Sequence, residues 1–188
     1  MTEDALLKNL GPLASLAGTW EGSKGVDVAP SPSRGSLETP FRERIVFEPM
    51  GPVDNHEQQL FGLRYSTTAY RIDEDDAFHE ELGYWLWDAK EGQVLRCFLV
   101  PRGVTILAGG DAAADDRAFS ISASVGSETY GISSNLFLDR EFKTVRYELT
   151  VTIEDANTFR YEEDMQILLK DLSDIFHHRD SNILSRVG

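Results

Sequence analysis

Hydrophobic and polar residues alternate along most of this chain, and the alternation is clearest between positions 144 and 153. The apolar positions of this run are Val145, Tyr147, Leu149, Val151 and Ile153. The positions between them carry Thr, Arg and Glu. Successive side chains of a strand point to opposite faces, so this period of two predicts a half-buried β-strand.

A second alternating run follows after the polar link at residues 154–157. Its apolar face carries Phe159, Tyr161, Met165 and Ile167. Two such runs joined by a short polar link predict a β-hairpin.

Similar strand-like runs cover residues 41–47, 78–87, 93–100, 104–107, 119–125 and 133–138. With the hairpin they suggest about nine or ten strands, with turn signals every 8–12 residues or so. No βαβ pattern is present, and closing the sheet would remove its exposed edges. We therefore predict an all-β fold: a single antiparallel up-and-down β-barrel of about ten strands that occupies residues 1–188.

Two segments depart from the alternation. Leu6, Leu7, Leu10 and Leu13 have helical spacing and predict a short N-terminal helix that acts as a lid or plug. Residues 28–40 are rich in Pro, Ser and Gly and predict a loop between the first two strands. Trp20, which follows Gly18-Thr19, is expected to plug the closed end of the barrel.

Composition narrows the function classes. The chain has 188 residues, a hydrophobic fraction of 41%, a charged fraction of 27% and a formal net charge of -14. That acidity argues against binding to nucleic acid and to anionic membrane surfaces.

The only cysteine is Cys97, so no intramolecular disulfide can form, and we expect a buried thiol between Leu95 and Leu99. The start resembles no signal peptide, and no apolar run approaches the roughly 20 residues of a membrane span, so we expect a cytoplasmic protein.

The histidines are the residues best suited to hold a metal or cofactor. His79 shares a face with Glu81, Gly83 and Trp85, and the pattern leaves open whether that face is the barrel interior or the surface. His177 and His178 are neighbours on a strand, so only one of them can point inward as a metal ligand. The other interpretation is a polar loop before a final short strand.

Other catalytic patterns are absent from the sequence. It contains no Gly-x-Ser-x-Gly elbow, no P-loop and no Gly-x-Gly-x-x-Gly. The adjacent carboxylates of residues 162–164 alternate between faces, so they cannot converge on one reacting atom, and we assign them no acid–base role.

Four segments together resemble nitrobindin and the haem-binding β-barrel domain of THAP4-type proteins, a fold related to lipocalins and fatty-acid-binding proteins. Residues 16–22, Leu-Ala-Gly-Thr-Trp-Glu-Gly, are similar to the opening motif of that family. Residues 41–47 are similar to its second strand, residues 78–85 to its His-x-Glu-x-Gly-Tyr block, and residues 102–107 to a turn followed by a hydrophobic strand.

The resemblance implies ferric haem, of the b type, near the mouth of a roughly ten-stranded barrel. It assigns the axial iron ligand to His178, with His177 as the second choice, because the family carries a histidine before a Leu-x-Arg-Val ending like residues 184–187. His79 would face the other side of the haem, and Thr19 would line the pocket. The implied chemistry is nitric oxide binding or peroxynitrite isomerisation, so the chain would be an enzyme only if haem is bound.

The sequence leaves two other functions open. The barrel could be a non-catalytic carrier for a fatty acid or another hydrophobic small molecule, with Arg42, Arg44 or Arg96 pairing with a carboxylate head. Its interior could also be filled by its own aromatic side chains. A homodimer is compatible with every one of these interpretations.

Overall fold

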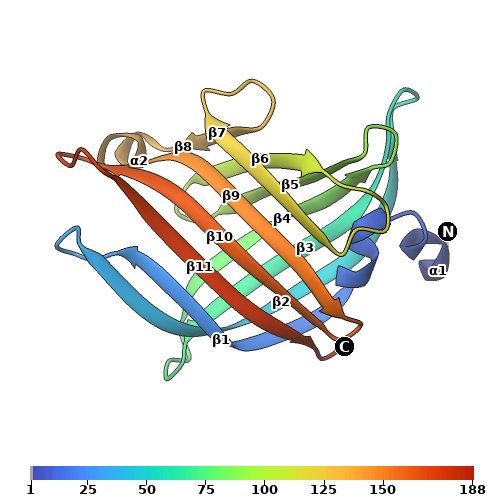
Figure 1. Cartoon of the computed structure of the whole chain (residues 1–188), viewed down its shortest axis with the longest axis horizontal. Helices are drawn as coiled ribbons and strands as arrows, with labels where there is room; N and C mark the ends of the chain where they lie inside the picture. The colour runs from blue at the N-terminus through green and yellow to red at the C-terminus, as the bar shows by residue number, and fades with distance from the viewer. Residues whose placement is uncertain (1) are drawn as a thin grey trace.

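Eleven strands close on themselves in the computed structural model, which describes residues 2–188 (Figure 1). The strands are β1 (Gly18–Pro30), β2 (Ser36–Asp54), β3 (Gln59–Arg71), β4 (Ala77–Asp88), β5 (Gln93–Val100), β6 (Val104–Asp111), β7 (Ala118–Val125), β8 (Gly131–Ser134), β9 (Phe142–Asp155), β10 (Thr158–Leu169) and β11 (Ile175–Arg186). Their order around the barrel is β1-β11-β10-β9-β7-β8-β6-β5-β4-β3-β2, and β1 pairs with both β2 and β11. The pairings are antiparallel except for the short parallel contact between β7 and β8. The predicted antiparallel barrel is therefore confirmed.

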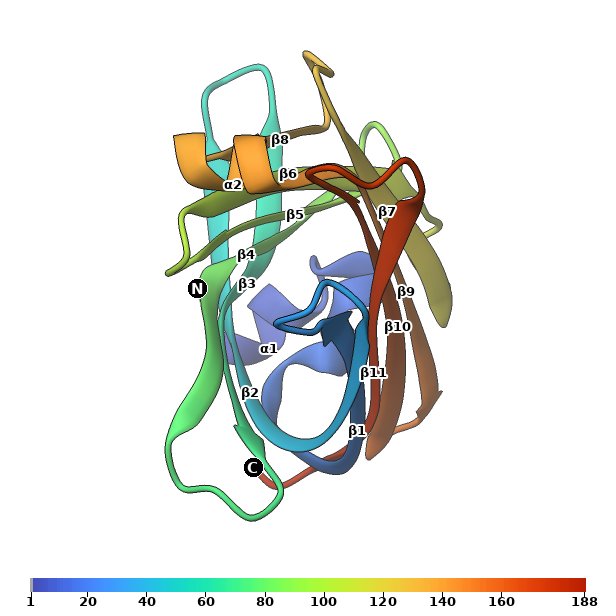
Figure 2. The same cartoon turned by 90° about the vertical axis from the view of Figure 1, so that its left-hand side faces the viewer.

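The N-terminal segment plugs one end of the barrel, as its leucine spacing predicted. It forms α1 (Glu3–Leu7) and the 3₁₀-helix η1 (Gly11–Leu16). Leu10, Leu13 and Leu16 are buried, and the Leu16 carbonyl accepts a 2.7 Å hydrogen bond from Trp20 Nε1. Burying these side chains removes apolar surface from water and anchors the plug to β1. Figure 2 looks into the opposite end, where the β1–β2 turn and α2 (Leu136–Glu141) lie.

Two sequence predictions about boundaries were wrong. The predicted loop at residues 28–40 is only a short turn, because β1 runs to Pro30 and β2 begins at Ser36, with Val28 paired to Glu38. The predicted strand at residues 133–138 ends at Ser134 and gives way to α2. The Asn135 side chain caps this helix by accepting from the backbone N–H groups of residues 137 and 138.

A register shift also changes which residue of β9 faces inward. Arg146 pairs with Gln166 and Thr144 pairs with Ile167, so β9 has one extra residue, Val145, at this point. Such a bulge reverses the alternation on one side of it. Thr144 is therefore buried, whereas Val145, predicted on the inner face with Tyr147, is only half-buried.

Among residues 2–188, no helix is both long enough and apolar enough to cross a membrane.

Candidate functional site

A cavity of about 660 Å³ occupies the barrel between the plug and the β1–β2 turn. It reaches from Leu16 of the plug to Ser31 and Pro32 of the turn. This volume lies within the range of about 300–1,000 Å³ typical of small-molecule and cofactor sites. A barrel filled by its own aromatic side chains is therefore not what the sequence forms.

The cavity is lined by aromatic side chains and by a group of charged side chains. The aromatic lining residues are Phe41, Phe47, Tyr65, Phe78, Trp85, Phe98, Phe142, Phe159 and Tyr161. Five carboxylate side chains also line it: Asp27, Glu43, Glu81, Glu163 and Asp180. The site is thus more acidic than a pocket built for an apolar ligand alone.

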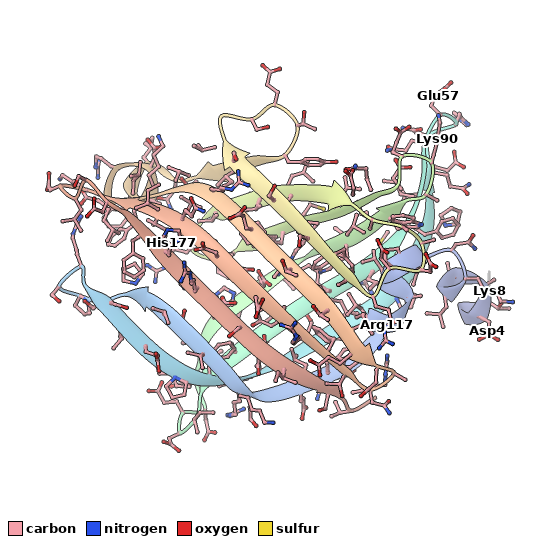
Figure 3. All side chains as sticks on the ribbon, in the orientation of Figure 1. Asp4, Lys8, Glu57, Lys90, Arg117 and His177 are labelled. Carbon is pink, nitrogen blue, oxygen red and sulfur yellow. The ribbon has the colours of Figure 1, made fainter. Side chains whose placement is uncertain are left out.

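Two of the four predicted site residues line this cavity. His178 enters it from β11 and His79 from β4, so the face of β4 that the pattern left open is the interior. The His177 side chain points outward, where Figure 3 labels it, and its Nδ1 lies 2.7 Å from Asp164 Oδ2. Thr19 lies outside the cavity lining, since its neighbour Trp20 takes the inward position and is fully buried.

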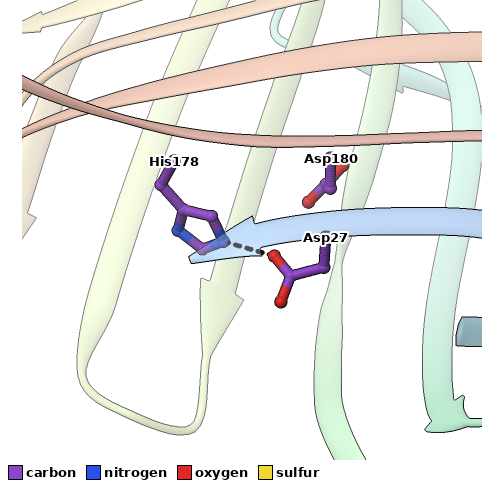
Figure 4. Close-up of side chains that lie close together, drawn as sticks. All are labelled: Asp27, His178 and Asp180. Atoms are coloured by element: carbon purple, nitrogen blue, oxygen red, sulfur yellow. Dashed lines mark hydrogen bonds and ion pairs between the residues drawn. The ribbon is translucent and has the colours of Figure 1, made fainter. Parts of the chain in front are cut away.

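His178 is held by a carboxylate from the neighbouring strand. Its Nε2 lies 2.8 Å from Asp27 Oδ1, and the side chains of His178 and Asp27 are 29% and 13% exposed (Figure 4). Asp27 pairs with Asp180 in the ladder between β1 and β11, so two carboxylates face each other beside the imidazole. Burial raises the pKa of Asp180 well above its usual range, and the carboxylate of Glu163 adds to the effect.

Arg96 carries the positive charge at the centre of the cavity wall. Its guanidinium is ion-paired with Glu81 and lies 3.1 Å from Glu163. Its Nε donates to Tyr65 Oη at 3.0 Å, and the Tyr147 hydroxyl bonds to both Arg96 and Glu163. All three guanidinium nitrogens of Arg96 therefore donate to other residues of the protein.

Among residues 2–188, Glu43 has no cationic partner. Asn182 Nδ2 donates to it at 2.8 Å, Tyr161 is its second hydrogen-bond partner, and only 5% of the residue is exposed. Burial raises the pKa of Glu43 from 4.5 to about 7, since the charged form loses its hydration and neighbouring carboxylates oppose it.

The two other arginines suggested as ligand partners lie on the outer surface. Arg44 is ion-paired with Glu21, and both side chains are about half exposed. Arg42 stacks over the Tyr70 ring, with 4.3 Å from its guanidinium carbon to the ring centroid. Neither of them can bind the head group of a molecule inside the barrel.

The sequence analysis did not predict the charged residues of the cavity wall, although the alternation pattern indicates two of them. Glu43 lies between the apolar inward residues Phe41 and Ile45, and Glu163 lies between Tyr161 and Met165. A charged residue on the apolar face of a strand is expensive unless it is paired or functional. The position of Glu43 and Glu163 between apolar residues therefore indicates that both side chains face the barrel interior.

Comparisons with known proteins agree with this architecture. The family model described as the THAP4-like, heme-binding β-barrel domain matches residues 9–186. The crystal structure of Rv2717c from M. tuberculosis has a TM-score of 0.66 and 19% sequence identity, over 97% of this chain and 98% of that chain. At this identity the likeness shows a shared fold. No curated protein sequence matches.

Proposed function

Since the chain belongs to the THAP4-like, heme-binding β-barrel domain family, we propose that its cavity binds ferric haem with the imidazole of His178 as the iron ligand. The observation that carries this proposal is the pairing of His178 with Asp27 on the cavity wall. A carboxylate that accepts from one ring nitrogen fixes the ring and makes the other nitrogen a better donor to a metal.

The surroundings of His178 suit a porphyrin. Apolar side chains line the cavity there, including Met165 on the paired position of β10, and Phe41 and Ile167. His79 contributes a second imidazole from β4. The lining also includes Arg102, whose guanidinium group could pair with a propionate, and Arg34, which is already ion-paired with Glu141.

The residues favour non-covalent haem of the b type. Covalent attachment in c-type proteins uses a Cys-x-x-Cys-His motif, and this chain has one cysteine. Bound ferric haem would supply an iron coordination position for nitric oxide or for isomerising peroxynitrite to nitrate, as the family resemblance implies. The roles of this chain would be to orient the imidazole through Asp27 and to limit water with the aromatic walls.

A carrier for fatty acids is the less favoured function. A fatty acid that placed its carboxylate deep inside the barrel would meet Arg96, whose buried guanidinium is already paired with Glu81 and Glu163.

Titration of the purified protein with hemin tests the proposal. We expect a shifted Soret band in the wild type and in His177→Ala, whose side chain lies on the outer surface, and loss of the shift in His178→Ala. Asp27→Asn should lower the affinity by about 10–100-fold. Absence of the shift in the wild type, or an unchanged shift in a folded His178→Ala protein, would refute it.

A further inference from the structure

Three potential metal ligands converge on one patch of the cavity wall. Asp27 comes from β1, and His178 and Asp180 come from alternate inward positions of β11 (Figure 4). One ligand atom from each residue lies within 4.8 Å of the other two. Because Asp27 and Asp180 are direct ladder partners, the closure of the barrel between β1 and β11 creates this arrangement.

One atom of this patch has no hydrogen-bond partner in the described part of the chain. Asp180 Oδ1 is shielded from solvent and accepts no hydrogen bond from any described residue. A buried carboxylate oxygen without a partner is costly, and a second carboxylate directly opposite raises the cost. A cation bound there would supply the missing partner and displace the proton that burial favours on Asp180.

No nearby side chain supplies such a cation in residues 2–188. Arg96 is bound to Glu81 and Glu163, and Arg179 lies on the outward face of β11, 3.9 Å from Asp164. His178 can supply one positive charge against two carboxylates, but only when it is protonated. A divalent cation would balance both carboxylates and leave the imidazole neutral.

We propose that Asp27, His178 and Asp180 form a binding site for a divalent transition-metal ion of the Zn²⁺ class. One imidazole nitrogen and two carboxylate oxygens are a donor set suited to Zn²⁺, Mn²⁺ or Fe²⁺. Three protein ligands leave a further coordination position, which opens into the cavity and can take water or an anionic ligand. The metal ion would bind where the carboxylates of the cavity wall lack positively charged neighbours.

This inference does not rest on haem binding, although the two proposals share His178 and Asp27. A metal ion and haem iron would compete for the same imidazole, so Zn²⁺ should inhibit hemin binding. Asp180 separates the two proposals, because it belongs to the metal site and has no assigned role toward haem.

Calorimetric titration of the chelator-treated, haem-free full chain with Zn²⁺ tests the site. We expect one equivalent to bind to the wild type and to His177→Ala, the matched histidine control on the outer face. Asp180→Asn and His178→Ala should each weaken binding at least about tenfold, comparable to the 10–100-fold cost of disturbing the surroundings of a metal ligand. Thermal unfolding checks that the variants fold, which is expected for Asp180→Asn because the amide has nearly the shape of the carboxylate and removes its charge.

Three results would overturn the inference: no Zn²⁺ binding to the wild type, unchanged binding in Asp180→Asn, or unchanged binding in His178→Ala. Hemin titration of the same samples keeps the two proposals distinguishable. A protein that binds Zn²⁺ but gives no Soret shift refutes the proposed function alone. A protein that binds hemin but not Zn²⁺ refutes the metal site alone.

Discussion

Replacing Glu43 by glutamine should make the barrel more stable, and the gain should grow with pH. Glu43 is buried on the cavity wall, and burial raises its pKa from 4.5 to about 7. A glutamine has nearly the same shape, keeps an oxygen that can accept from Asn182, and never ionises. The substitution therefore isolates the cost of holding a carboxylate in this position.

The size and sign of the effect follow from linkage. A folded-state pKa above the unfolded value means that the contribution of Glu43 to stability is fully present below pH 4.5 and is lost as the pH rises through about 7. Each pKa unit corresponds to about 1.4 kcal/mol, so the full loss is about 3 kcal/mol. The advantage of Glu43→Gln should thus rise from under about 1 kcal/mol at pH 4.5 to about 3 kcal/mol at pH 8.

Urea unfolding of the haem-free and metal-free protein at pH 4.5 and pH 8 measures the difference. For a chain of this length, about 3 kcal/mol also corresponds to a rise of roughly 6–12 °C in the melting temperature at pH 8. The matched control is Glu38→Gln, because Glu38 is an exposed glutamate of the same strand. Its free energy of unfolding should equal that of the wild type at both pH values. An advantage of Glu43→Gln that is equal at pH 4.5 and pH 8 would refute the argument from desolvation.

Further substitutions test the ion-pair cluster and the plug. Arg96→Met should destabilise the barrel by about 3–5 kcal/mol, because it leaves Glu81 and Glu163 buried without a cation. Adding Glu81→Gln and Glu163→Gln should restore most of the loss in urea unfolding, whereas no restoration would mean that packing rather than charge was lost. Leu13→Ala should cost about 2–5 kcal/mol, since Leu13 is fully buried in the plug. Its affinity for hemin should stay near that of the wild type, and a large drop would mean that the plug shapes the ligand site.

The sequence by itself determined the class of fold and many of the side chains that face the barrel interior. Alternation in β9 and β10 identified the hairpin and placed Tyr147, Leu149 and Phe159 correctly on the inner face. Alternation also established that His177 and His178 point to opposite sides. These features are local, because the direction of a side chain along a strand depends only on the backbone of that strand.

The sequence alone was less informative about which face of each strand lies inside the barrel. Cys97 was expected to be buried, but in β5 the inward residues are its neighbours Arg96 and Phe98, and Cys97 is half-buried on the outer face. The hydrophobicity of β5 is similar on both faces, since Leu95 and Leu99 flank the thiol. A strand without clear contrast leaves its own orientation undecided until its neighbours fix it.

The composition of the site was decided only by the tertiary structure. His178 meets Asp27 across 151 positions of sequence, and Arg96 meets Glu163 across 67. These contacts depend on the register of each ladder, and the bulge at Val145 shows that one extra residue is enough to exchange an inward side chain. Barrel closure then brought the first and last strands together and set Asp27 opposite Asp180. A period of two specifies faces within one strand, whereas register and closure specify which side chains of different strands meet.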